Sequence, residues 1–359
     1  MVKILANLKR EFWELFLDKG EDRMRFSIVV YNVAELYWKM EWSLSSNFYK
    51  LGSGSFASVF AWESRGCIAL KQAAAIESKE NIHKEFENLT IIYQHKMHAL
   101  AHIVEFVFPE PFKWYESFWD FAQEMRIDRS IERGLEGVTA LYTMQRLWPI
   151  PPALATTIRS LYFPAEEQWH DAPAFIARIY LGQKAVERSA PTRFFNYKNF
   201  PLSEDKLRAL DLDVHSIAAA MGRSLACIHF RAGLDARDVE FVLGGDAVNP
   251  YQKHALMCID FNQVRRHSFH CAELTDAILD NDKYFPLPSS SCWQHFVDGY
   301  MAVAHTILLP ADPSTTCTAL AMSVIEAIRA EWENPRRRTG GRHPDTQTPS
   351  HQANFEPQI

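Results

Sequence analysis

The sequence predicts an α+β protein of two lobes, in which a small antiparallel β-sheet with one helix precedes a larger, mainly helical lobe. Two strand-like runs followed by a stretch with helical spacing lie early in the chain. Several segments with apolar residues at helical spacing fill the second half. Between the two parts, prolines at 149, 151 and 152 break the chain. Together these observations predict a lobe boundary at about residue 148.

Composition limits the class of protein. The chain has 359 residues, of which 47% are hydrophobic and 13% aromatic, so a large packed core is expected and wholesale disorder is excluded. The net charge of -6 argues against nucleic acid as the main partner, because binding a phosphate backbone needs a clustered basic surface. No run of about 18 uncharged apolar residues predicts a membrane span. Six cysteines without a signal peptide are typical of an intracellular protein, cytoplasmic or nuclear.

The first lobe is predicted from a strand-rich segment and one helix. Strand-like runs at 57–62 and 67–71 are joined by a turn-prone stretch at 63–66. A helix is predicted from about 78 to 96, with Ile82, Phe86, Leu89 and Tyr93 at helical spacing. Residues 102–108 and 138–147 are predicted to be two further strands, with a charged, aromatic insertion between them at 109–137.

The second lobe is predicted to begin with helices. Residues 213–231 form a helix, and the apolar runs 239–243 and 255–259 form a hairpin. Further helices are expected near 272–279, 293–308 and 315–332. The predicted organisation is therefore an N-terminal helical extension at 1–46, a first lobe at 47–148, a second lobe at 149–333 and a disordered basic tail at 334–359.

A glycine-containing turn after the first strand is a candidate phosphate-binding loop. Without a Cβ, glycine lets such a turn bring backbone N–H groups close to a ligand phosphate. Phe56 is placed to cap the loop, and Val59, in the strand that follows, to press against an adenine ring. The residues of this loop are Gly52, Ser53, Gly54, Ser55 and Phe56.

A lysine and a helical carboxylate follow this loop in the order that phosphate binding needs. Lys71 ends the next strand-like run, where it can neutralise phosphate charge, and Glu85 is spaced to hold it, with Glu87 as the alternative. The order of loop, strand, lysine and helix glutamate resembles the first lobe of the protein-kinase-like superfamily. The resemblance implies that Met144 lies in the hinge segment that meets adenine. Ala57 stands where the usual loop has a third glycine.

The segment 225–243 extends this resemblance into the second lobe. In the superfamily a helix ends in Leu-His, a loop carries the catalytic Asp, and a metal-binding Asn begins an apolar strand. Asp235, followed five residues later by Glu240, keeps this spacing, whereas Asp238 after Arg237 mimics the Arg-Asp pair of protein kinases. The spacing favours Asp235 as the residue that orients an acceptor hydroxyl and accepts its proton, and Asp238 stays the alternative. Glu240 still offers oxygen to a hard cation in place of Asn.

An apolar strand that ends in Asp260 completes the resemblance. Asp260, Phe261 and Asn262 are similar to the Asp-Phe-Gly element of the superfamily, which implies that Asp260 is the main Mg²⁺ ligand. Asn262 replaces the glycine, as other residues do in small-molecule phosphotransferases of the aminoglycoside type. No Ala-Pro-Glu-like element or activation loop is evident in the sequence, which argues against a regulated protein kinase.

The resemblance implies a protein that binds ATP and Mg²⁺ between its lobes. The expected reaction is transfer of the γ-phosphoryl group to the hydroxyl of a small molecule, and the expected partners are a nucleotide and a small-molecule or protein acceptor. The departures at Glu240 and Asn262, and the missing His before Asp235, also permit a pseudokinase-like protein that binds or acts as a scaffold.

One further resemblance and one cluster of histidine and cysteine residues add to the sequence-based hypotheses. The segments 199–202, 236–244 and 259–263 also resemble an uncharacterised fungal family that is catalogued only as a domain of unknown function. A compact cluster of His267, His270 and Cys271, with Cys258 or Cys292 as a fourth ligand, leaves a zinc-dependent DNA-associated factor as a third alternative.

Overall fold

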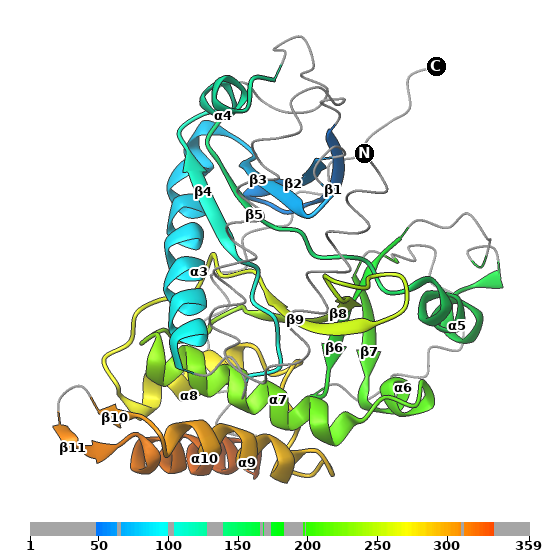
Figure 1. Cartoon of the computed structure of the whole chain (residues 1–359). Coiled ribbons are helices and arrows are strands. Elements are labelled where there is room, and N and C mark those ends of the chain that lie inside the picture. Colours follow the sequence, from blue (N-terminus) through cyan, green and yellow to red (C-terminus); the bar gives the residue numbers. More distant parts are fainter. Residues whose placement is uncertain are drawn as a thin grey trace, which may run out of the picture. The chain divides into compact units, whose positions relative to one another are not determined.

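The computed structural model describes residues 48–62, 66–99, 104–127, 139–165, 168, 174–182, 197, 199–309 and 312–333. They belong to the second of two compact units, Asn47–Ile359. The predictions for 1–46 and 334–359 fall outside the described residues. Within the described part, an antiparallel sheet with one long helix precedes a larger part that holds most of the helices, which confirms the predicted α+β class and its order of a small sheet lobe before a mainly helical one (Figure 1).

The first lobe is built on a five-stranded antiparallel sheet with the strand order β1-β2-β3-β5-β4. The predicted strands at 57–62, 67–71 and 138–147 are confirmed as β2, β3 and β5. Edge strand β4 and the short helix α4 (Phe118–Met125) lie in the predicted insertion. The strands are β1 (Phe48–Ser53), β2 (Ala57–Trp62), β3 (Ile68–Ala73), β4 (Pro111–Tyr115) and β5 (Leu141–Gln145).

Helix α3 (Lys79–Ala99) connects the two lobes and confirms the helix predicted at 78–96. Its buried residues Ile82, Glu85, Leu89, Ile92 and Lys96 recur every three or four positions, so one face of the helix points into the protein. This face contacts β3, β4 and β5 and, in the second lobe, the π-helical turn η5 (Cys227–Arg231). In Figure 1 α3 is the long cyan helix that runs from beside the first sheet to the level of helix α7 (Val214–Ala226).

The strand predicted at 102–108 is not part of the first sheet. Val104, Phe106 and Phe108 are buried at alternate positions, so the extended conformation was predicted correctly for these residues. Val107, however, donates its N–H to Leu256 O at 2.8 Å and accepts from Cys258 N at 2.9 Å. The segment therefore pairs with strand β9 (His254–Ile259) of the second lobe, because a period-two pattern defines the buried face of a strand but not its partner.

A four-stranded sheet with the order β7-β6-β8-β9 extends the predicted hairpin of the second lobe. Strands β8 (Glu240–Gly245) and β9 (His254–Ile259) pair antiparallel, which confirms the hairpin, although β8 runs on through both glycines. Strands β6 (Ile176–Tyr180) and β7 (Asn199–Ser203) were not predicted, and they pair parallel to each other. Arg178 in the middle of β6 and Pro201 in β7 hide the apolar pattern of these short strands.

The segment that leaves β5 packs directly on β8. Gly245 donates its N–H to Trp148 O at 2.9 Å, and a Cβ placed on Gly244 would lie 2.6 Å from the same oxygen. Glycine at position 244 thus permits a close approach of the two backbones. The chain between the lobes is fixed against the strand that begins with Glu240.

The helices predicted in the second lobe are confirmed with shifted ends, whereas α5 (Pro152–Tyr162) and α6 (Glu204–Ala209) were not predicted. The helix predicted at 213–231 is α7 continued by η5, and short strands β10 (Leu308–Leu309) and β11 (Asp312–Thr316) separate the last two helices. Among the described helices, none is both long and apolar enough to span a bilayer. The helices are α5 (Pro152–Tyr162), α6 (Glu204–Ala209), α7 (Val214–Ala226), α8 (Cys271–Asp280), α9 (Trp293–Ala304) and α10 (Thr318–Glu333).

Replacing Gly222 tests the close packing of α7 on α9. A Cβ at Gly222 would overlap Phe296 O and lie 2.8 Å from Tyr300 N, both backbone atoms of α9. We expect Gly222→Ala to lower the free energy of unfolding by about 3 kcal/mol, because a helix must shift. Gly54→Ala is the control, since a Cβ there meets nothing within 4 Å. Equal denaturant midpoints for the two variants would contradict the packing described.

Lys96 predicts an unusual pH dependence of stability. The side chain is 8% exposed, its Nζ donates to Phe106 O at 2.5 Å, and burial lowers its pKa to about 8. Between about pH 8 and the ordinary lysine value of 10.5 the unfolded chain therefore binds more protons than the folded one, so stability rises with pH in this window. Over this window the lowered pKa of Lys96 changes the free energy of unfolding by about 3 kcal/mol. We expect the stability advantage of Lys96→Met over the native protein to shrink from pH 7 to pH 10. A constant difference in unfolding free energy would contradict this.

Candidate functional site

The ammonium group of Lys71 lies between two carboxylates that come from distant parts of the chain. Its Nζ is 2.6 Å from Glu85 Oε1 and 3.7 Å from Asp260 Oδ1. Burial alone would lower the pKa of Lys71, but the negative charges of Glu85 and Asp260 outweigh burial and raise it. Glu87, the alternative helical partner, is exposed and lies 3.8 Å from His83 instead. The structure thus brings together a lysine of the first sheet, a glutamate of α3 and an aspartate that follows β9.

The register of the first sheet places both predicted adenine contacts, Val59 and Met144, on the face that carries Lys71. Val59 is paired directly with Lys71, and Ala69 is paired with Met144. Paired residues share a face of a sheet, as do residues two apart along a strand. Val59 and Met144 are half-buried, and Ala69 is buried. This row of apolar side chains beside an ammonium group is suited to an aromatic base joined to a charged group.

The predicted phosphate loop connects β1 to β2 and is open on its outer side. Gly54 donates its N–H to Ala57 O at 2.8 Å, and Ala74 donates to Phe56 O at 2.8 Å. Neither Gly52 nor Gly54 has a positive φ, and a Cβ added to either would meet nothing within 4 Å. The fold itself does not require these glycines. Their missing side chains leave the backbone accessible to a ligand.

Asp260 and Asn262 supply oxygen atoms that lack hydrogen bonds. Asp260 follows β9 with a φ of 65°, a left-handed conformation that is unusual for a residue other than glycine. Such outliers persist only where the surrounding structure holds them. The buried atoms Asp260 Oδ1 and Asn262 Oδ1 accept no hydrogen bond from any described residue. The Asp260 side chain is 33% exposed, so a ligand can reach it.

Asn88 fastens the segment after Asp260 to helix α3. The buried Asn88 side chain donates from Nδ2 to Phe261 O at 3.1 Å and to Val264 O at 3.0 Å. One amide group therefore satisfies two main-chain carbonyls of the second lobe. Because Glu85 lies one helical turn earlier, the same helix positions both Lys71 and the Asp260 segment.

Asp235, the favoured catalytic candidate, is held by backbone N–H groups. It is 6% exposed, and its Oδ1 accepts from Arg237 N at 3.1 Å and Arg265 N at 2.9 Å. His229 Nε2 lies 3.2 Å from Asp235 O, and burial lowers the pKa of His229 to about 3, so the imidazole is neutral at physiological pH. By accepting these N–H groups, the Asp235 side chain holds the backbone of its own loop against the segment at Arg265.

Asp238, the alternative candidate, has a different environment. Its backbone is left-handed, with a φ of 58°, and its Oδ2 accepts from Gln263 Nε2 at 2.6 Å. Burial raises the pKa of Asp238, and the charge of Asp260 raises it further, while Lys283 and Arg178 oppose the rise. Asp238 therefore interacts electrostatically with the carboxylate that lies beside Lys71.

Glu240, the predicted second metal ligand, is paired with an arginine. Arg178 Nη2 lies 2.5 Å from Glu240 Oε1, and the two side chains are 24% and 11% exposed. Burial raises the pKa of Glu240 to about 7, opposed by Arg178 and reinforced by Asp260 and Asp238. The charges of Asp238 and Asp260 thus act on Glu240, which is already paired with Arg178.

Two residues of the site were missed from sequence. Asn88 lies three positions after Glu85, on the same face of a predicted helix, so its position was a usable signal. Arg178 had no such signal, because it reaches Glu240 through strand pairing between residues that are far apart in the chain.

The structure does not bring the predicted zinc ligands together. His267 uses both ring nitrogens: Nε2 donates to His229 O at 2.7 Å, and Nδ1 accepts from Phe269 N at 3.0 Å. Cys258 and Cys292 are fully buried, and Cys292 Sγ lies 3.9 Å from Arg208 Nη2. Across the described residues, no group of three or more His, Cys, Asp or Glu side chains has the arrangement of a metal site.

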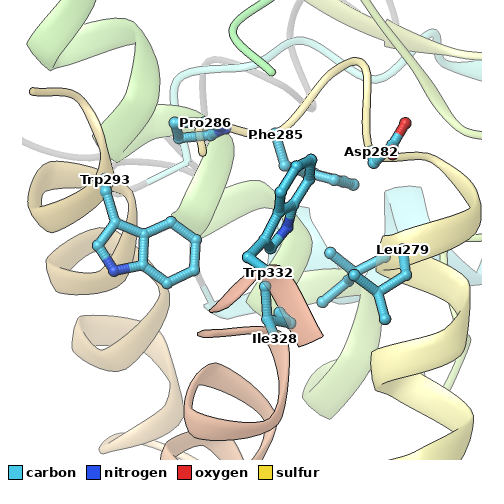
Figure 2. A pocket seen from close by; sticks show the side chains of 8 residues that line it. Leu279, Asp282, Phe285, Pro286, Trp293, Ile328 and Trp332 are labelled. Atoms are coloured by element: carbon cyan, nitrogen blue, oxygen red, sulfur yellow. The ribbon is translucent and has the colours of Figure 1, made fainter. Parts of the chain in front are cut away.

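Two cavities of the described residues are lined by neither Lys71 nor Asp260. One, of about 440 Å³, is lined by polar residues at the start of α3 and by Glu116. The other, of about 10 Å³, can hold no more than a single water molecule. Figure 2 shows Trp293, Phe285 and Trp332 around this second cavity, with Leu279 and Ile328 nearby. None of the predicted site residues lines either cavity.

One family model matches part of the chain. A family named DUF3669 and described as zinc finger protein matches residues 256–312. The match includes Asp260 and the His267, His270 and Cys271 cluster. Its description mentions neither a kinase-like fold nor a fungal source, so the resemblance to a fungal family stays a prediction. No curated protein matches the chain.

A solved structure gives a weak overall likeness. It is a thermostable mutant of an aminoglycoside phosphotransferase, crystallised as a ternary complex with AMP-PNP and hygromycin B. The identity is 11%, the match covers 85% of this chain and 92% of that one, and the TM-score is 0.25. At these values the likeness supports no inference about the site, whose description depends on the contacts given above.

Replacing Asn88 tests whether α3 holds the Asp260 segment. Asn88→Asp keeps the shape of the side chain but removes both donated hydrogen bonds, leaving two carbonyls facing a carboxyl group. We expect a loss of about 3 kcal/mol in the free energy of unfolding and faster amide hydrogen exchange in residues 260–264.

Asn249→Asp is the matched control for this change, because the Asn249 amide donates to the exposed side chain of Gln252. The control should unfold like the native protein. Unchanged exchange at 260–264 in Asn88→Asp would show that the segment is held by other contacts.

Proposed function

We propose that this chain binds ATP with Mg²⁺ at the Lys71 site and transfers the γ-phosphoryl group to a hydroxyl of a small molecule. The observation that carries the proposal is the convergence of Lys71, Glu85 and Asp260. A buried ammonium group with a half-buried carboxylate 3.7 Å away offers a phosphate contact next to an oxygen ligand for a cation. A purely structural ion pair would not need the partly exposed Asp260.

In this proposal the first lobe holds the nucleotide. The adenine lies against the apolar row that includes Val59 and Met144, and the open glycine loop covers the phosphates with its backbone N–H groups. Lys71 donates to phosphate oxygens, and Glu85 keeps its ammonium group in place. Most of the catalytic effect of such a site comes from positioning and charge stabilisation.

The oxygen donors fit a magnesium ion. Asp260 Oδ1 and Asn262 Oδ1 are buried without hydrogen-bond partners among the described residues, and hard cations bind such oxygens. Mg²⁺ usually takes one or two carboxylates together with substrate phosphates, so a larger ligand cluster is not needed. When bound, the ion neutralises charge on the phosphates.

The proposed transfer assigns the proton to Asp238. The acceptor hydroxyl oxygen forms a bond to the γ-phosphorus while the bond from that phosphorus to the bridging oxygen breaks, which leaves ADP. The hydroxyl proton passes to the Asp238 carboxylate, whose environment includes Asp260. Asp235 is the less favoured base, because it is only 6% exposed whereas Asp238 is half-buried and easier for an acceptor to reach.

A second candidate function is nucleotide binding without transfer. The ion pair of Arg178 with Glu240 favours it, since Glu240 is engaged where the superfamily has a free metal ligand. Release of ADP in the presence of hydroxyl-bearing acceptors separates the two candidates. Stable ATP binding without ADP release would favour a binding or scaffold protein.

A nucleotide thermal-shift series tests the proposal. We expect ATP with Mg²⁺ at 100 times its Kd to stabilise the native protein by about 3 kcal/mol. Lys71→Met should lose most of the stabilisation, because the phosphate contact is gone. Asp260→Asn should lose the part that depends on Mg²⁺.

Two further variants make the series decisive. Lys71→Met with Glu85→Gln avoids leaving a buried carboxylate unpaired, so it should fold and still fail to bind ATP. Lys113→Met is the control, because Lys113 pairs with Glu124 on the surface. If ATP stabilised the Lys71 variants as much as the native protein, or did not stabilise the native protein at all, the proposed nucleotide site would be contradicted.

A further inference from the structure

The ion pair between Arg178 and Glu240 is built into the second sheet. Arg178 on β6 is paired in register with Val242 on β8, and Glu240 lies two residues before Val242 on the same face. Arg178 Nη2 reaches Glu240 Oε1 at 2.5 Å. The guanidinium group is thus held beside the carboxylate by adjacent strands and not by a mobile loop.

A second basic residue adds to the positive charge at this position. Lys283 Nζ lies 5.6 Å from the centre of the Tyr180 ring and 5.2 Å from that of Tyr284. Its charge, like that of Arg178, acts on Asp238 and Glu240. The charges of Arg178 and Lys283 therefore both act on Asp238 and Glu240, and Arg178 is in direct contact with Glu240.

The two possible metal positions, Asp260 and Glu240, differ in whether a basic side chain lies within hydrogen-bond distance of the carboxylate oxygen. At Asp260 the buried oxygen Oδ1 has no hydrogen-bond partner among the described residues, because the Lys71 ammonium lies 3.7 Å away, beyond hydrogen-bond distance. At Glu240 the corresponding oxygen is bound by a guanidinium group, which is always charged. A divalent cation at Glu240 would have to displace Arg178 or lie next to its positive charge in a poorly solvated site.

We infer that Arg178 takes the place of a second divalent cation, so that the nucleotide binds with one metal ion, held at Asp260. The inference rests on the proposed nucleotide binding and makes it more specific. In kinases two Mg²⁺ ions are held, one by an Asp and one by an Asn at the position of Glu240. Here Glu240 binds Arg178, and the fixed guanidinium supplies the positive charge of the second ion. Arg178 is a positioning and charge-supplying residue of the site.

Counting bound metal ions tests this inference. Mn²⁺ is titrated into the full chain with an equal concentration of AMP-PNP, and free Mn²⁺ is measured by electron paramagnetic resonance. A fluorescent ATP analogue reports nucleotide binding separately. We expect one Mn²⁺ per bound nucleotide in the native protein and in Glu240→Asn, because Arg178 still repels a second ion.

The double variant Arg178→Met with Glu240→Asn isolates the role of the guanidinium. It removes both charges, so no unpaired ion is buried, and it restores the Asn of two-metal sites. We expect two Mn²⁺ per nucleotide. Arg223→Met is the control, since Arg223 pairs with Glu105 on the surface, and should keep one.

The outcomes are distinct. Two Mn²⁺ in the native protein, or one in the double variant, would overturn the role of Arg178 while leaving nucleotide binding intact. Absence of nucleotide binding by the fluorescent analogue would overturn the proposed function and this inference together.

Discussion

The ion pair of Lys71 with Glu85 depends on helix α3, which also holds the segment after β9 through Asn88. The helix therefore fixes the distance between an ammonium group of the first sheet and a carboxylate of the second lobe. Each contact is buried, and an unpartnered polar group there would cost free energy. A shift of α3 would separate Lys71 from Asp260 even if both strands kept their places.

Burial gives the charges around this helix their effect. Lys71 keeps its proton because two carboxylates outweigh the cost of burial. Lys96, further along the same helix, has no carboxylate in an ion pair with it among the described residues, and burial lowers its pKa to about 8. Two lysines on neighbouring elements thus differ in charge behaviour because only one lies beside carboxylates. Asp260 and Glu240 differ in a similar way: Asp260 Oδ1 accepts no hydrogen bond from a described residue and lies 3.7 Å from Lys71, whereas Glu240 Oε1 lies 2.5 Å from Arg178.

Local patterns predicted the parts of the site that depend on short stretches of chain. The order of glycine loop, strand, lysine and helix indicated the pair of Lys71 and Glu85, and the strand ending in Asp-Phe indicated Asp260. Contacts between residues far apart left no such pattern. Arg178 reaches Glu240 through the pairing of β6 with β8, and residues 104–108 pair with β9 although their alternation suited the first sheet equally. Alternation identifies a buried face, but the partner is chosen by the whole fold.

A crystal structure of the full chain with AMP-PNP and Mn²⁺ tests most directly whether Lys71 and Asp260 share one ligand. The expected result is an anomalous difference peak for Mn²⁺ in contact with Asp260, triphosphate oxygens against Lys71, and the adenine over Val59 and Met144. A nucleotide bound elsewhere on the chain, or a triphosphate that leaves Lys71 in contact with Glu85 alone, would contradict the proposed site.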